Sequence, residues 1–290
     1  MLKTVFLTDN QERGQGVAML LGGFDGLHVG HRSLLARAKA SGLPVGIMTI
    51  AGCKDKGIFT FAERERIFKA SGVDFVFELP FEEIKALSPT VFLELLKNNF
   101  NPSLFVCGED FRFGKNAMGD AEKLKALGEK YGIEVQVVEQ LSLNGKAISS
   151  TEIRRCVRDG KISEANEMLG YRYGYNLPVE HGYQRGRTWD FPTINQEIPK
   201  GLVMPKFGVY CSKVKVGDRL YSGVTNIGVK PTVKVETAPL AETFIIGYSG
   251  DLYGEKIAIE LYEFIRPERL FGSFAELKAE IGRNTEFVKT

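Results

Sequence analysis

Two of the chain's three histidines lie in one short segment, GGFDGLHVGH, at residues 22–31. Its glycines allow backbone N–H groups to approach a ligand closely, and a helix that begins here would add unpaired N–H groups and the positive end of its dipole. His28 and His31 are three residues apart, so on a helix their rings can face the same side. Two imidazoles suit a phosphate that gains negative charge in a transition state. The alternative is a glycine-rich turn with two solvated histidines.

A second segment with this character is GKAISSTEIRR, at residues 145–155. Its three consecutive hydroxyl residues precede an expected helix, and Arg154 on the first turn could bind a phosphate in bidentate fashion. The segment therefore predicts a second polyphosphate contact, made by Ser149, Ser150, Thr151 and Arg154. The alternative is helix capping alone, because Ser149 and Glu152 have the spacing of a capping box.

Up to about residue 170, short apolar runs alternate with helical patterns. Such alternation predicts a parallel sheet with helices on both faces, and ligands of such sheets gather at the carboxyl ends of the strands. The histidine segment follows the first of these strands directly. The expected strands are VAMLL, PVGIMTI, DFVFEL, SLFVCG and EVQVV, and the expected helices are residues 32–40, FAERERIFKASG, SPTVFLELLKNN and DAEKLKALGEKYG.

After Gly170 the pattern changes to a period of two, in segments separated by Gly, Asp and Asn turns. This predicts antiparallel strands in a small barrel, followed by an amphipathic helix at about residues 273–283. We therefore predict two domains, residues 1–170 and 171–290.

Composition excludes several classes of protein. A formal net charge of +2, from 38 basic and 36 acidic residues, gives no broad field for a nucleic-acid backbone. No apolar run reaches the roughly 18 residues of a membrane span, and the first residues do not resemble a signal peptide. The four cysteines form no CxxC pair, which favours buried, reduced thiols. We expect a cytoplasmic protein with small-molecule partners, no nucleic-acid or membrane partner, and an oligomeric state that the sequence leaves open.

Several motifs in one order resemble a known family. GGFDGLHVGH with ISSTEIR resembles the nucleotidyltransferase superfamily, and GEDFRFGKNAMGD, residues 108–120, resembles the form in bacterial bifunctional riboflavin kinase/FAD synthetases (FMN adenylyltransferases). HGYQRGRTWDFPTIN, NIGVKPT and ETFIIGYSGDLYGEKIAIELYEFIRPERLF are similar to the flavokinase module of that family. The resemblance spans about residues 17–285. It implies an α/β protein, with a Rossmann-like nucleotidyltransferase domain on a parallel sheet, then a six-stranded antiparallel flavokinase β-barrel and a C-terminal helix.

The resemblance implies that the first domain transfers AMP from ATP to FMN. The phosphate of FMN is already ionised near neutral pH, so the step needs alignment and charge stabilisation rather than a base. His28, His31 and Arg154 would be catalytic, with Mg²⁺ neutralising the remaining charge. ATP would be bound by Gly23, Phe24, Asp25, His28, His31, Ser149, Ser150, Thr151 and Arg154. The flavin would lie near Asp110, Phe111 and Arg112, although Phe111 and Phe113 could equally be core residues at a strand end.

The resemblance implies that the second domain moves the γ-phosphate of ATP onto riboflavin. The acceptor is a neutral hydroxyl, which benefits from a general base, and Glu242 is the candidate. The alternative for Glu242 is an exposed carboxylate at a strand edge. Thr193 and Asn195 offer oxygens to Mg²⁺ and ATP. Asn226 would contact flavin, and a loop with Gly182, Gly186 and Arg187 would bind ATP.

The chain departs from the family pattern in three places. Asp190 and Ile194 replace a glycine and an alanine, and AGCKDKG at residues 51–57 replaces a segment that contains His-Pro. One alternative is therefore an FMN adenylyltransferase with a weak or inactive kinase domain, and another is a non-catalytic flavin-binding regulator. A nucleotidyltransferase for a nicotinamide or pantetheine substrate leaves the second half unexplained. An aminoacyl-tRNA synthetase would normally carry a Lys-Met-Ser-Lys loop and a basic surface. The sequence has no such loop, and its charge balance does not predict a basic surface, so both features argue against this alternative.

Overall fold

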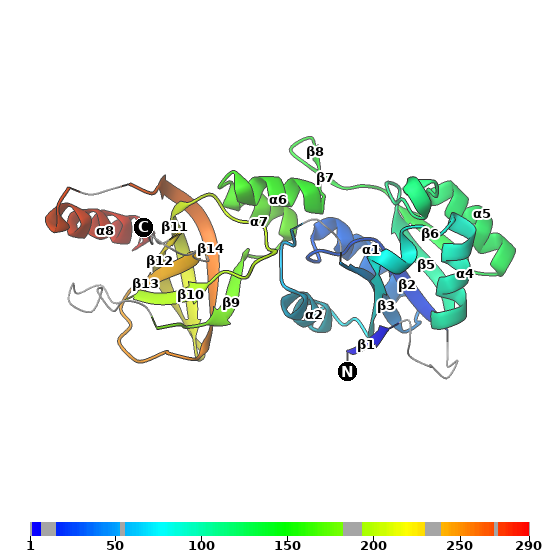
Figure 1. Cartoon of the computed structure of the whole chain (residues 1–290), viewed down its shortest axis with the longest axis horizontal. Coiled ribbons are helices and arrows are strands. Elements are labelled where there is room, and N and C mark those ends of the chain that lie inside the picture. The colour runs from blue at the N-terminus through cyan, green and yellow to red at the C-terminus, as the bar shows by residue number, and fades with distance from the viewer. Residues whose placement is uncertain are drawn as a thin grey trace. The chain divides into compact units, whose positions relative to one another are not determined.

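The computed structural model describes residues 2–6, 16–52, 56–181, 193–229, 239–269 and 272–289. Contacts divide the chain into two compact units, residues 1–55 with 59–150, and residues 56–58 with 151–290. Each unit contains a six-stranded sheet (Figure 1). Within the part of the chain that is described, no helix is both long and apolar enough to cross a membrane.

The sheet of the first unit is entirely parallel, with the strand order β1-β4-β3-β2-β5-β6. Its strands are β1 (Lys3–Phe6), β2 (Val17–Leu21), β3 (Val45–Ala51), β4 (Phe75–Pro80), β5 (Pro102–Gly108) and β6 (Glu134–Val138). The parallel sheet predicted from the alternating pattern is confirmed. The short edge strand β1, which pairs with β4, was not among the predicted strands.

The described residues of this unit contain five α-helices, three of which begin at a capping side chain of the usual type. They are α1 (Val29–Ala40), α2 (Phe61–Ala70), α3 (Phe81–Ile84), α4 (Pro89–Phe100) and α5 (Ala121–Tyr131), accompanied by the 3₁₀ helix η1 (Lys115–Ala117) and the hairpin β7 (Ser142–Leu143) and β8 (Lys146–Ala147). The Ser88 side chain caps α4 just before a proline, and Asn101 ends that helix in a left-handed conformation. Thr60 and Asp120 cap α2 and α5 in the same way as Ser88.

The two faces of the parallel sheet are both buried. Side chains of α4 and α5 join one face in a cluster that includes Met19, Phe105 and Phe77. Alternate residues such as Leu20 and Val106, also fully buried, point to the other face, and α1 contacts β2 and β5. Because both faces are covered, the open surface for a ligand lies at the ends of the strands.

The second unit contains the helices α6 (Ser150–Arg158), α7 (Ile162–Leu169) and α8 (Phe274–Lys289) and an antiparallel sheet. Its strand order is β10-β13-β12-β11-β14-β9. A bridge between Glu180 and Asn195 joins the two edges, and the Gln196 Nε2 atom donates to the Leu177 carbonyl at 2.6 Å. The predicted six-stranded barrel is therefore confirmed. Its strands are β9 (Gly174–Pro178), β10 (Thr193–Glu197), β11 (Gly208–Val216), β12 (Arg219–Gly228), β13 (Leu240–Ile245) and β14 (Lys256–Pro267).

Helix α7 is fastened to the barrel through Asn166, which is 3 % exposed. Its Nδ2 atom donates to the Leu261 carbonyl at 2.9 Å, and its Oδ1 atom accepts from the Tyr173 N–H at 2.7 Å. Helices α6 and α7 precede residue 170, yet α7 and all of α6 beyond Ser150 fall in the same unit as the barrel. The domain boundary at residue 170 stays a prediction.

Three sequence expectations are corrected. Helix α1 begins at Val29, before the predicted Arg32, so His31 lies in its first turn. Helix α8 continues to Lys289, beyond the predicted end at Arg283. Cys211 is only half-buried, whereas Cys107 and Cys156 are buried thiols as expected; Cys53 lies outside the described residues.

Candidate functional site

The first candidate site lies at the carboxyl ends of β2 and β5. These strands are parallel neighbours, with Leu21 opposite Cys107. The chain leaves β2 for β3 and β4 on one side and returns to β5 on the other, so the strand order reverses here. Such a switch point is where open α/β sheets bind ligands. The fold therefore brings residues 22–31 and residues 108–112 to the same edge of the sheet.

The loop after β2 has an unusual backbone. Phe24 has a φ of 38° and Gly26 a φ of 94°. A left-handed conformation in a phenylalanine costs about 1–3 kcal/mol and persists only where packing holds it. The Phe24 ring is fully buried and lies 4.4 Å from the His31 ring, measured between centroids. Gly23, in contrast, borders open space, because no described atom lies within 4 Å of a Cβ built there.

The two histidines form one stacked pair, with ring centroids 3.5 Å apart. His28 caps α1, since its Nδ1 atom accepts a hydrogen bond from the His31 N–H at 3.2 Å. Its proton therefore belongs on Nε2, which can donate to a ligand. The His31 Nδ1 atom lies 3.0 Å from the Gly26 carbonyl oxygen, to which it must donate, so the proton of neutral His31 lies on Nδ1 and Nε2 holds a lone pair.

Burial keeps both imidazoles neutral. It lowers the pKa of His28 to about 2, with a smaller contribution from the neighbouring His31. Burial also lowers the pKa of His31 to about 4, against the opposing effect of the hydrogen bond to Gly26. At neutral pH the pair therefore offers one N–H donor, at His28. For His31 to become a second donor at Nε2, it would have to take up a proton from solvent, which a nearby anion would favour.

The second predicted phosphate segment begins close to α1. A Cβ built on Gly30 would lie 3.8 Å from the Ile148 carbonyl oxygen, and Ser149 is the next residue. Helix α6 begins at Ser150. The Glu152 carboxylate pairs with Arg155, with an Nε–Oε2 distance of 2.7 Å.

The positions of Thr151 and Arg154 relative to the histidines stay a prediction, because both belong to the second unit. Asp25 is 7 % exposed and lies in the histidine loop of the first unit.

The predicted flavin segment follows β5. Asp110 and Arg112 are exposed, and the Arg112 NH1 atom donates to the Phe111 carbonyl at 2.9 Å. Phe111 is half-buried and stacks on Phe113 at 5.5 Å between centroids. Phe113 is a core residue that packs against Phe92. The core alternative therefore holds for Phe113, while part of Phe111 remains exposed at the edge of the core.

The second candidate site is one row of residues across the barrel. Asn195 of β10 lies opposite Glu242 of β13, and Glu242 lies opposite Asn226 of β12. The row continues through Val209 of β11 to Arg266 of β14. Directly opposed residues on antiparallel strands point to the same face. The barrel thus gathers on one face three of the residues predicted for riboflavin phosphorylation.

Polar atoms in this row are available to ligands. The Asn195 side chain is 8 % exposed, and its Oδ1 atom is buried without a hydrogen-bond partner among the described residues. Thr193 is exposed and lies two residues before Asn195, on the same face of β10. These oxygens are ligands of the type that Mg²⁺ prefers, together with substrate phosphates and water. Within the described ranges, no three His, Cys, Asp or Glu side chains form a metal site.

Some predicted residues lie outside the described ranges, and one residue near the site was not predicted. The predicted ATP loop with Gly182, Gly186 and Arg187, and also Asp190, belongs to residues 182–192, which are not described. Glu268 was not predicted, yet its Oε1 atom accepts from the Asn226 Nδ2 atom at 3.2 Å. The two residues are far apart in the sequence, and only the strand pairing brings them together.

Comparisons with known proteins cover both units. Residues 10–152 match the family model described as FAD synthetase, and residues 169–290 match the one described as riboflavin kinase. A bifunctional riboflavin kinase/FMN adenylyltransferase of Listeria monocytogenes is 30% identical, over 98% of this chain and 96% of the relative. The protein of that name from Escherichia coli K12 is 33% identical, over 95% and 92%.

A solved structure also matches the whole chain. It is a crystal structure described as a macrolide-efflux protein from Streptococcus pneumoniae, with a TM-score of 0.88 and 28% identity over 99% of both chains. This chain is therefore similar in fold to that protein over 99% of its length.

Proposed function

This chain belongs to the bifunctional riboflavin kinase/FMN adenylyltransferase family, and we propose that it phosphorylates riboflavin to FMN and then adenylylates FMN to FAD with release of pyrophosphate. The observation that carries the proposal is the pair of family models in series, each over a fold with its own candidate site. We do not assign macrolide efflux to this chain. The relatives named as riboflavin kinase/FMN adenylyltransferases match it over nearly the same length as the crystal structure described as an efflux protein. The cytoplasmic location and the exclusion of nucleic-acid and membrane partners stay predictions.

For adenylyl transfer, an oxygen of the FMN phosphate attacks the α-phosphorus of ATP, and the bond from that phosphorus to pyrophosphate breaks. We assign the hydrogen bond from His28 Nε2 and a protonated His31 to the triphosphate, beside the backbone of Gly23 and Phe24. Ser149 and Ser150 would extend this contact, since Ile148 lies against Gly30. Thr151, Arg154 and Asp25 keep their predicted roles in ATP binding. Asp110, Phe111 and Arg112, at the neighbouring strand end, are assigned to FMN.

For riboflavin phosphorylation, the 5′-hydroxyl attacks the γ-phosphorus of ATP and loses its proton. We assign Glu242 as the base, supported by its half-buried position between Asn195 and Asn226. Asn226 would contact the flavin. The predicted loop of residues 182–187 would bind ATP.

Mg²⁺ fits the oxygens of Asn195 and Thr193, because the Asn195 Oδ1 atom is buried with no partner among the described residues, and a buried amide oxygen is costly unless a ligand satisfies it. When bound, the ion neutralises the charge of the ATP phosphates. Asn195 holds this oxygen in the same row as Glu242, so the two residues would place ATP and the hydroxyl side by side.

A weak or inactive kinase domain is the alternative within the same family. Ile194 is half-buried in β10 opposite Thr243, on the face away from Asn195 and Glu242. Its side chain therefore does not enter the row that we assign to phosphorylation. This observation favours an active kinase.

The test is incubation of the chain with riboflavin, ATP and Mg²⁺, followed by chromatography of the flavins. FMN should appear first and FAD second, and the formation of neither would refute the proposal. Glu242→Gln should slow FMN formation by about 10²-fold or more, while FAD formation from supplied FMN stays unchanged. Glu197→Gln, on the exposed end of β10, is the matched control and should alter neither reaction. Equal loss of both activities in Glu242→Gln would contradict separate sites.

A further inference from the structure

The Asn226 amide is held in one orientation. Its Nδ2 atom donates to the Glu268 Oε1 atom at 3.2 Å. An ionised carboxylate can only accept hydrogen bonds, so the nitrogen end of the amide must face Glu268. The Asn226 Oδ1 atom is thereby directed away from Glu268 as an acceptor. Asn226 also lies directly opposite Glu242.

The Glu268 carboxylate fits against a residue that has no side chain. A Cβ built on Gly228 would lie 2.1 Å from the Glu268 Oε1 atom and 2.7 Å from its carboxyl carbon. Any larger residue at position 228 would therefore move the carboxylate. The backbone of Gly228 does not require glycine for its conformation, since its φ is not positive.

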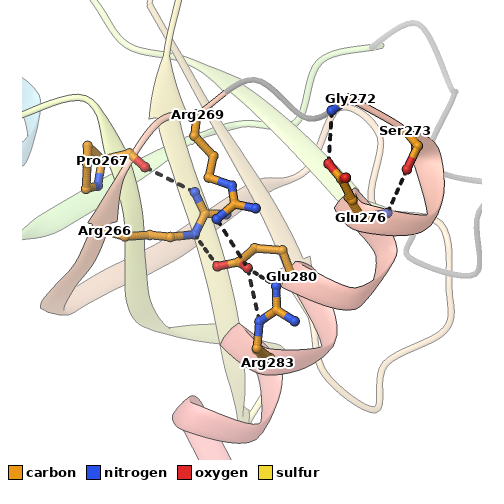
Figure 2. A network of polar contacts seen from close by, with 8 residues as sticks. All are labelled: Arg266, Pro267, Arg269, Gly272, Ser273, Glu276, Glu280 and Arg283. Atoms are coloured by element: carbon orange, nitrogen blue, oxygen red, sulfur yellow. Dashed lines mark hydrogen bonds and ion pairs between the residues drawn. The ribbon is translucent and has the colours of Figure 1, made fainter.

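The chain on both sides of Glu268 is tied to helix α8. Figure 2 shows Arg266, Arg269 and Arg283 converging on the Glu280 carboxylate. The Arg266 Nε atom lies 3.0 Å from Glu280 Oε1, and both side chains are largely buried, with 18 % and 10 % exposed. The hydrogen bond from Arg283 is the main cause that lowers the pKa of Glu280.

Helix α8 itself begins at a defined point. The Ser273 Oγ atom accepts from the Glu276 N–H, and the Glu276 carboxylate accepts from the Gly272 N–H (Figure 2). These contacts satisfy N–H groups at the helix start. The segment that carries Glu268 is linked to this ordered helix through the contacts of Arg266 and Arg269 with Glu280.

We propose that Glu268 is a positioning residue of the riboflavin-phosphorylating site, which holds the Asn226 amide so that Oδ1 accepts a hydrogen bond from an N–H or O–H group of the flavin substrate. Glu280 and its arginines hold the segment on which Glu268 lies. The inference rests on the proposed kinase function of this unit.

Two variants remove the contact in different ways. Glu268→Ala deletes the carboxylate, whereas Gly228→Ala keeps both Glu268 and Asn226 and displaces the carboxylate with one methyl group. In each, the amide is free to turn, and the KM for riboflavin should rise about fivefold with little change in kcat, as expected for the loss of one hydrogen bond. The Kd for riboflavin, measured by quenching of flavin fluorescence, should rise by the same factor. Glu268→Gln should have a similar effect, because its amide can donate as well as accept.

Two controls separate this effect from misfolding and from loss of charge. FAD formation from supplied FMN, in the same preparations, should be unchanged. Glu263→Gln removes the same charge from an exposed position on β14, opposite Cys211, and should leave the KM and Kd for riboflavin unchanged.

An unchanged KM and Kd in Glu268→Ala and Gly228→Ala would overturn the inference. A fall in kcat without a change in Kd would also overturn it, because such a result would place Glu268 in the chemical step. If the wild-type chain made no FMN, the proposed kinase function would fail. The binding measurement would still decide whether Glu268 positions a flavin contact.

Discussion

The buried His28 should make the stability of the first unit depend on pH. Its side chain is 5 % exposed and burial lowers its pKa to about 2, whereas an unfolded histidine has a pKa near 6.5. As pH falls below about 6.5, the unfolded state therefore takes up a proton that the folded state does not, and folding loses stability. At pH 5 this loss is RT ln(1 + 10^1.5), or about 2 kcal/mol, and at pH 8 it is close to zero.

His28→Asn isolates this contribution. The Asn Oδ1 atom can replace Nδ1 as the acceptor that caps α1, and asparagine does not titrate. Hydrogen exchange of the β2 amides, measured by mass spectrometry, reports the unfolding free energy of this unit. Between pH 8 and pH 5, the wild type should lose about 2 kcal/mol relative to the variant.

A matched control removes a histidine from the other unit. His181→Asn deletes a ring that stacks on Tyr253, and it should not alter the pH dependence of exchange in β2. If the wild type and His28→Asn lost stability in parallel, His28 would not be held neutral, and the assignment of its proton to Nε2 would fail.

Three further predictions concern other residues. Binding of ATP should be accompanied by uptake of about one proton at His31, measured by calorimetry in buffers of different ionisation enthalpy. His31→Asn keeps a donor near the Gly26 carbonyl but lacks Nε2, and equal proton uptake in this variant would contradict the assignment. Asn195→Ala should raise the Mg²⁺ concentration needed for FMN formation at least about tenfold, and an unchanged Mg²⁺ dependence would remove Asn195 from the metal site. Asn166→Ala should destabilise the second unit by about 2–4 kcal/mol through two lost buried hydrogen bonds, measured by urea unfolding. Asn99→Ala in α4 is its control. An unchanged urea midpoint in Asn166→Ala would contradict the linking role of Asn166.

Local patterns in the sequence were sufficient for the two architectures. Alternating strands and helices predicted the parallel sheet, and period-two segments such as residues 208–228 predicted the barrel, because each pattern reflects which face a strand or helix buries. The start of α1 was predicted too late. Its cap is the His28 imidazole, and histidine is not among the side chains that usually mark a helix start.

The candidate phosphate-binding residues of the first half were found from the sequence because glycines, histidines and hydroxyl residues are concentrated in short segments, whereas the flavin-binding and kinase residues were implied by the resemblance to a known family. The protonation states of these histidines could not be read from the sequence. Whether His28 and His31 are charged depends on their burial. That burial follows from the packing of Phe24 against His31 and from the position of both histidines at the start of α1. Burial is a property of the folded neighbourhood, and residue spacing contains no information about it.

The sequence by itself predicted phosphate binding in the first half, at a glycine-rich turn before a helix, whereas the carboxylate base of the second half was predicted from the resemblance to a known family. Only the tertiary structure decided which of the candidate residues of the second half lie side by side. Asn195, Asn226, Glu242 and Glu268 come from separate parts of the chain. The register of the strands aligns the first three, and the segment that directly follows β14 adds Glu268. Register is set by hydrogen bonds between distant segments and by the side chains each face must bury, so no local pattern could specify it.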